Sequence, residues 1–137
     1  RTTSSAASDV YKRQHFINKL LDSNFQILVL TNIPFKYLDD RKHCFQKNGL
    51  NLQIIAGNGP KGLVIKELIR DFNEKVFFID DLAPHISSVK EEVSRSKTIH
   101  YISDERLSKL AVSPKEADFR AYSWKDIYNF LINEISG

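Results

Sequence analysis

The strongest chemical signal in the sequence is a pair of adjacent carboxylates, Asp80 and Asp81, which directly follows the apolar run 76–79. A short, continuous run of β-branched and aromatic residues is typical of a strand that is buried on both faces. Ligands of open α/β sheets bind at the carboxyl ends of the strands, and carboxylate oxygens are ligands that Mg²⁺ prefers. The pattern therefore predicts a Mg²⁺ site at Asp80 and Asp81. The alternative is that one carboxylate caps the next helix and the other is solvated.

Two other polar positions follow apolar runs and have the chemistry of a phosphate site. Thr31 comes after the first apolar run, and Lys61 comes after the second, beyond a loop rich in Gly and Pro. A hydroxyl, amides and a cation together can bind phosphoryl oxygens. We therefore expect Thr31 and Asn32 to bind phosphate and Lys61 to neutralise its charge. The alternatives are that Thr31 caps a helix and that Lys61 is a solvated loop residue, with Lys66 competing for its role.

The elements that would position these residues alternate along the chain. Four apolar runs are predicted strands: 25–30, 52–56, 76–79 and 98–102. Five segments with apolar residues at helical spacing are predicted helices: 15–23, 34–48, 63–72, a helix that begins at Pro84, and a last helix capped by Ser123. Alternating strands and helices favour right-handed βαβ units. We therefore predict an α/β domain with a mostly parallel sheet covered on both faces, and an irregular segment at 103–122.

Some polar side chains have no clear chemical role in this pattern. His85 follows Pro84 in the first turn of a predicted helix, where capping or a surface position is favoured over catalysis. Asp118 and Arg120 fall in the segment that is expected to be irregular, and the sequence assigns them no function.

Composition excludes several classes of protein. A length of 137 residues fits one domain, and 42% hydrophobic residues are enough for a core. The net charge of +3 is small, and the basic residues form no stripe suited to nucleic acid. A single cysteine excludes an internal disulfide and is compatible with a reducing compartment. No apolar run has the length of a membrane span, and no signal peptide is visible. We therefore expect a cytoplasmic protein that binds neither nucleic acid nor membranes.

The first fourteen residues differ from the rest of the chain. The segment 1–14 is polar, rich in Ser, Thr and Ala, and without apolar periodicity. We expect it to be a disordered or non-native tail and place the folded domain at 15–137. The chain starts with Arg and contains no methionine, which suggests a piece of a longer protein.

Taken together, the three motifs resemble a known family. Thr31 after a hydrophobic strand, Lys61 in Pro-Lys-Gly, and the run Phe-Phe-Ile-Asp-Asp ending at Asp81 resemble the second, third and fourth motifs of the haloacid dehalogenase-like hydrolase superfamily, in order and spacing. The resemblance covers about residues 15–135. It implies a Rossmann-like three-layer α/β/α fold and Mg²⁺-dependent phosphoryl transfer from a small phosphorylated substrate through an aspartyl-phosphate. On this resemblance Thr31 binds the phosphoryl group, Lys61 steadies it, and Asp80 with Asp81 ligates or orients Mg²⁺.

One departure from the family affects the expected activity. The superfamily's first motif, Asp-x-Asp, supplies the nucleophile and the general acid/base, and the sequence contains no Asp-x-Asp. The nearest approach, Asp9-Val10-Tyr11, has no strand before it. We therefore expect this chain to be an amino-terminally truncated fragment without its nucleophile strand and with little or no turnover. Loss of that strand would expose sheet edges and favour self-association.

Two other classes remain open. A non-catalytic α/β binding module could keep the same scaffold without the chemistry. A phospho-receiver-like domain also places an acidic pair, a Thr and a Lys at one sheet edge. In a receiver the acidic pair comes first, whereas here Thr31 and Lys61 precede Asp80, so the motif order disfavours this class.

Overall fold

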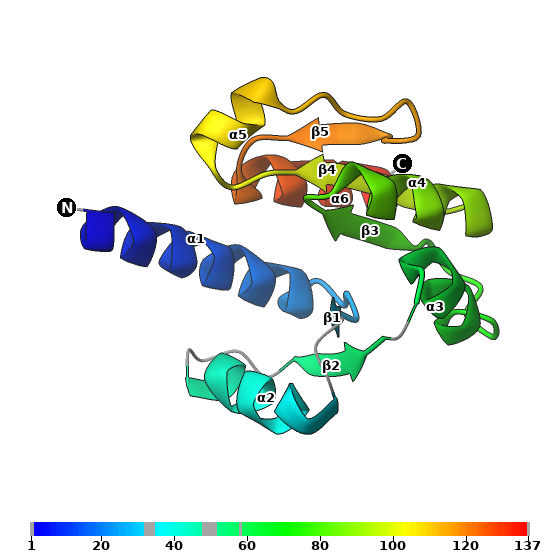
Figure 1. Ribbon diagram of the computed structural model, residues 1–137, viewed down its shortest axis with the longest axis horizontal. Helices are drawn as coiled ribbons and strands as arrows, with labels where there is room; N and C mark the ends of the chain where they lie inside the picture. The colour runs from blue at the N-terminus through cyan, green and yellow to red at the C-terminus, as the bar shows by residue number, and fades with distance from the viewer. Residues whose placement is uncertain (1, 32–34, 48–51, 58, 137) are drawn as a thin grey trace. The chain divides into compact units, whose positions relative to one another are not determined.

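The computed structural model describes residues 2–31, 35–47, 52–57 and 59–136 (Figure 1). The chain divides into two compact units, Arg1–Gly57 and Asn58–Gly137, and each is described by itself. Both units combine helices with strands that pair in parallel. The described residues therefore form an α/β protein with two small parallel sheets, where we had predicted one continuous sheet.

The first unit contains one pair of strands. Its elements, in chain order, are α1 (Thr2–Asp22), β1 (Leu28–Thr31), the 3-10 helix η1 (Phe35–Tyr37), α2 (Leu38–Lys47) and β2 (Gln53–Ala56). The strands β1 and β2 run parallel, with Leu28 opposite Gln53 and Thr31 opposite Ala56. The predicted strands at 25–30 and 52–56 are thus present with slightly shifted ends. The expected helix limits at Pro34 and Asn48 lie outside the described residues.

Helix α1 is longer than the sequence pattern suggested. We expected a disordered or non-native tail at 1–14, but α1 begins at Thr2, so the segment is helical. This segment contains no Gly or Pro, and its Ala, Lys, Arg and Gln residues favour helix, so nothing local stops the helix from extending. The other end is as predicted: Asn24 adopts a left-handed conformation with φ of 69°, which is typical just after a helix terminus.

The second unit contains a three-stranded sheet. Its elements are α3 (Lys61–Leu68), β3 (Phe77–Asp80), α4 (Ala83–Glu92), β4 (Lys97–Tyr101), α5 (Glu105–Leu110), β5 (Phe119–Ala121) and α6 (Trp124–Ser136). The strand order is β3-β4-β5, and both pairs are parallel. Three successive residues of β4, Thr98, Ile99 and His100, are at most 1% exposed. Because successive side chains of a strand point to opposite faces, both faces of β4 are buried.

We had predicted that the segment 103–122 is irregular, and this prediction was wrong. The segment contains α5 and β5. Helix α5 has no buried residue: its two leucines, Leu107 and Leu110, lie at helical spacing but are both exposed. It is instead started by Asp104, whose carboxylate accepts hydrogen bonds from the N–H groups of Arg106 and Leu107. Strand β5 has three residues, with Arg120 at its centre, and it is defined by its pairing with β4. Neither element could be recognised from an apolar pattern.

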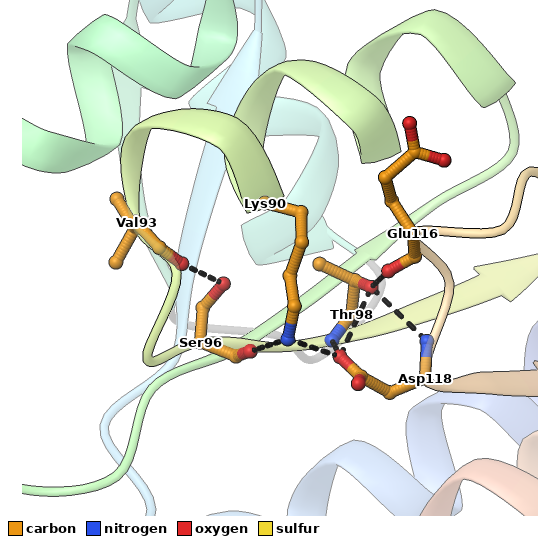
Figure 2. A network of polar contacts seen from close by, with 6 residues as sticks. All are labelled: Lys90, Val93, Ser96, Thr98, Glu116 and Asp118. Carbon is orange, nitrogen blue, oxygen red and sulfur yellow. Dashed lines mark hydrogen bonds and ion pairs between the residues drawn. The ribbon is translucent and has the colours of Figure 1, made fainter.

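A polar network joins the start of β5 to β4 and to α4 (Figure 2). Lys90, on α4, donates to the carbonyl of Ser96 at 2.6 Å and to Asp118 at 2.8 Å. The same Asp118 oxygen accepts the backbone N–H of Thr98 at 2.8 Å. Burial opposes ionisation of Asp118, but the hydrogen bonds from Lys90 and Thr98 and the charge of Lys90 outweigh it, so its pKa is lowered. Asp118 therefore has a structural role.

The helices of the described residues differ from helices that cross a lipid bilayer. None of them combines the length and the apolar character that a membrane-spanning helix needs.

Candidate functional site

Two of the predicted site residues, Lys61 and Asp80, meet in the second unit. Lys61 is the first residue of α3, and Asp80 is the last residue of β3. The Lys61 Nζ lies 2.7 Å from Oδ2 of Asp80, and the two side chains are only 13% and 6% exposed. Lys61 Nζ also lies 5.9 Å from the centre of the Phe78 ring. The cation and the carboxylate therefore form a largely buried ion pair at the carboxyl end of a strand.

The position of Lys61 depends on very close packing of α3 against α4. The N–H of Gly62 donates to the Ser88 hydroxyl at 3.1 Å. A Cβ atom at position 62 would lie 2.2 Å from the backbone carbonyl oxygen of Ser88, which is far inside van der Waals contact. Glycine is therefore required for this approach of the two helices, and the approach fixes the first turn of α3 that carries Lys61.

His85 is a member of the site that the sequence analysis missed. Its Nδ1 lies 3.2 Å from Oδ2 of Asp80, the same oxygen that contacts Lys61. The ring is 27% exposed, so it reaches both the carboxylate and the surface. A usable signal was its place in the first turn of the helix that starts at Ala83, shortly after Asp80, because that turn lies next to the end of β3.

The carboxylate of Asp80 is ionised at neutral pH. Its Oδ1 accepts the N–H of Leu82 at 2.8 Å, so both oxygens have donors. Burial raises the pKa, but the hydrogen bonds from Lys61 and Leu82 and the charge of Lys61 outweigh this and lower it overall. Asp80 thus bonds to one backbone N–H just before α4, that of Leu82, as the capping alternative expected in part, while Asp81 is exposed. The cation that Asp80 contacts is Lys61, so the Mg²⁺ alternative stays a prediction.

Asp81 is held through its backbone, whereas its side chain is exposed. Its carbonyl oxygen lies 3.0 Å from Nε2 of His100, on β4. The other ring nitrogen, Nδ1, lies 2.7 Å from the hydroxyl of Ser113. Arg120 donates to this same hydroxyl at 3.0 Å. The structure thus places Arg120, which had no assigned role, in a cluster that ends at the acidic pair.

The remaining predicted residues are each described within their own unit. Thr31 is the last residue of β1 in the first unit, where its carbonyl accepts the N–H of Gly57 at 2.8 Å. Asn32 lies outside the described residues. Lys66 lies 3.7 Å from Glu92 and lines a cavity of about 470 Å³ near the carboxyl ends of α3 and α4. Lys61, and not its competitor Lys66, is therefore the lysine that pairs with Asp80.

The oxygen atoms of the site decide whether it fits Mg²⁺. In the part of the chain that the structure describes, no three His, Cys, Asp or Glu side chains gather in an arrangement suited to a metal ion. Of the four lone pairs of Asp80, two on Oδ2 and one on Oδ1 face N–H donors, which leaves one. Asp81 adds an exposed carboxylate. Mg²⁺ is commonly held by one or two carboxylates together with phosphate oxygens and water, so the donor set fits.

Comparison with known proteins does not assign this site. No protein-family model, curated protein or solved structure matches the chain. Any functional conclusion therefore depends on the motifs and on the geometry of the site itself.

Proposed function

We propose that this chain carries the phosphate- and Mg²⁺-binding half of a haloacid dehalogenase-like phosphotransfer site, within a Rossmann-like three-layer α/β/α fold. Its substrate would be a small phosphorylated molecule. The observation that supports this proposal is the largely buried pair of Lys61 and Asp80 at the carboxyl end of β3, with Asp81 beside it. An isolated solvated lysine, the alternative reading of Lys61, would not have this geometry.

Each residue would contribute a distinct interaction. Lys61 would neutralise the charge of a phosphoryl group, because its ammonium is held in place by Asp80 while it retains further N–H donors. The free lone pair of Asp80 and the carboxylate of Asp81 would hold Mg²⁺, which would offset phosphoryl charge when bound. Thr31, with Asn32, would donate to phosphoryl oxygens. Since the sequence has no Asp-x-Asp, we propose binding without appreciable turnover by this chain.

The test measures Mg²⁺ and orthophosphate binding by isothermal titration calorimetry. We expect the wild-type chain to bind Mg²⁺ in the presence of orthophosphate, and Asp81→Asn to lose that binding. Asp71→Asn is the matched control, because Asp71 is another exposed carboxylate of the second unit that lies outside the site. Equal Mg²⁺ binding by both variants and wild type would exclude Asp81 as a ligand. Mg²⁺-dependent phosphate release from p-nitrophenyl phosphate would contradict the proposed lack of turnover.

A non-catalytic α/β binding module is the second candidate, and one observation favours it. Oδ2 of Asp80 already contacts both Lys61 and His85, so this oxygen is satisfied without a metal ion. Absence of any Mg²⁺ binding by the wild-type chain, with orthophosphate binding retained, would make this candidate the better one.

A further inference from the structure

His100 lies at the centre of the second unit and connects three segments of the chain. It is 1% exposed and occupies the fourth position of β4. Its two ring nitrogens contact the backbone carbonyl of Asp81, after β3, and the hydroxyl of Ser113, before β5. A buried imidazole with both nitrogens engaged is a fixed link between these segments, because any movement of the ring breaks at least one contact.

The contacts determine which nitrogen carries the proton. The Asp81 carbonyl oxygen can only accept a hydrogen bond, so Nε2 of His100 must be the donor in this pair. In the neutral ring, Nδ1 is then an acceptor, and the Ser113 hydroxyl lies 2.7 Å from it. His100 thus points an N–H group at the backbone of Asp81.

Arg120 holds the other side of this link in place. Its Nη2 donates to the carbonyl of Ser108 at 2.7 Å and to the Ser108 hydroxyl at 3.0 Å. Its Nη1 donates to Ser113 at 3.0 Å and lies 3.2 Å from Nδ1 of His100. Because the guanidinium is planar, these contacts fix the Ser113 hydroxyl and the imidazole relative to α5.

Asp81 needs such a link because the strand ladder ends before it. The register of β3 and β4 pairs Asp80 with His100, and no ladder pair follows. Asp80 is also held by Lys61, His85 and the Leu82 N–H. Asp81 receives the contact from His100 on its backbone carbonyl, and its side chain is exposed.

We propose that His100 is a positioning residue that sets Asp81 beside Asp80 so that both carboxylates face one divalent cation. This inference depends on the proposed function, since Mg²⁺ is the ion that the pair would hold. Residues that orient metal ligands change metal affinity by about 10–100-fold when they are replaced. His100 would act in this way through the backbone of its ligand.

The experiment compares two amide substitutions that each reproduce one ring nitrogen. In His100→Gln the side-chain amide nitrogen reaches the place of Nε2 and can still donate to Asp81. In His100→Asn the shorter amide reaches only the place of Nδ1. By titration calorimetry, we expect His100→Asn to weaken Mg²⁺ binding about 10-fold or more, and His100→Gln to retain most of the affinity. Equal affinities in the two variants would overturn the proposal.

Two further measurements separate this outcome from unfolding and from failure of the proposed function. Urea unfolding, followed by the fluorescence of Trp124, the single tryptophan, identifies the range in which both variants are folded. Carbon NMR shifts of the Asp81 carbonyl and carboxyl, recorded without metal, test positioning directly. If the wild type binds no Mg²⁺, the proposed function fails, and the NMR shifts then decide whether His100 positions Asp81. Shifts altered only in His100→Asn support positioning, and shifts altered equally in both variants overturn it.

Discussion

Replacing Lys61 by Met should destabilise the second unit through its effect on Asp80. Methionine keeps most of the apolar stem and removes the charge. Breaking a buried ion pair by removing one partner costs about 3–5 kcal/mol. Asp80 keeps its contacts with the Leu82 N–H and with His85, so the remaining carboxylate is not left without donors. We therefore expect a smaller loss in the free energy of unfolding, about 2–3 kcal/mol.

The assay is urea unfolding followed by the fluorescence of Trp124, which lies in the second unit. Lys66→Met is the matched control on the same helix, because the Lys66 and Glu92 side chains are 64% and 30% exposed and 3.7 Å apart. Exposed pairs contribute about 0–1 kcal/mol, so the control should change little. In a double-mutant cycle with Asp80→Asn, the two losses should not add, because each substitution removes the same pair. Equal effects of Lys61→Met and Lys66→Met, or additive losses in the cycle, would refute the reasoning.

Three further predictions concern the second unit. Folding lowers the pKa values of Asp80 and Asp118, so the stabilisation that these carboxylates contribute is present above about pH 4 and is lost as the pH falls through the folded-state pKa. When the pH is lowered from 7 to 3, the urea midpoint of Asp118→Asn should therefore fall less than that of the wild type. Gly62→Ala should cost about 2 kcal/mol or more in urea unfolding, because the new Cβ meets the backbone of Ser88. An unchanged or raised stability, which is the usual result of Gly→Ala in a helix, would contradict the close approach. Asp104→Ala should cost about 1 kcal/mol and speed amide exchange in α5, since it removes the acceptor of two N–H groups; unchanged exchange would exclude the cap.

The elements that were predicted best are those with an apolar pattern of their own. The runs at 52–56 and 76–79 became β2 and β3, each displaced by about one residue, because consecutive apolar side chains are needed wherever a strand is covered on both faces. The last helix was found for the same reason, since Ile127 and Leu131 repeat at helical spacing and are both buried. Where burial decides the structure, a single sequence carries the signal.

The elements that were missed depend on partners that are distant in the sequence. Strand β5 exists because β4 offers a free edge, and the Asp118 carboxylate bonds to Thr98, 20 residues earlier. Helix α5 is six residues long and has only two apolar residues, Leu107 and Leu110, which are too few to reveal a helix in the sequence. No local pattern contains this information. The two separate sheets have the same cause, because the apolar character of a strand does not specify which strand lies beside it.

The site was predicted in part, for related reasons. Lys61 and Asp80 were expected to lie close together because each follows an apolar run, at the carboxyl end of a strand of one sheet. They do meet, but through the packing of α3 against α4 inside the second unit, because β2 and β3 belong to different sheets. His85 was within reach of the same argument, since it lies one turn into the helix that follows Asp80. His100 was not, because its position inside β4 predicts only burial. Its contact with Asp81 depends on the register of β3 and β4, which the sequence does not reveal.

The charges of the site fit the proposed function better than they would fit a site for Mg²⁺ alone. Lys61 lies 2.7 Å from Asp80, so a metal ion on the other oxygen of that carboxylate would experience the repulsion of a fixed ammonium. A phosphoryl anion between the Lys61 ammonium and the metal ion would offset this repulsion, because it attracts both cations. The same ammonium would hold a phosphate weakly without the metal, since Asp80 already offsets its charge. A carboxylate pair beside a buried lysine is therefore suited to binding a cation and an anion together, as phosphoryl-transfer chemistry requires.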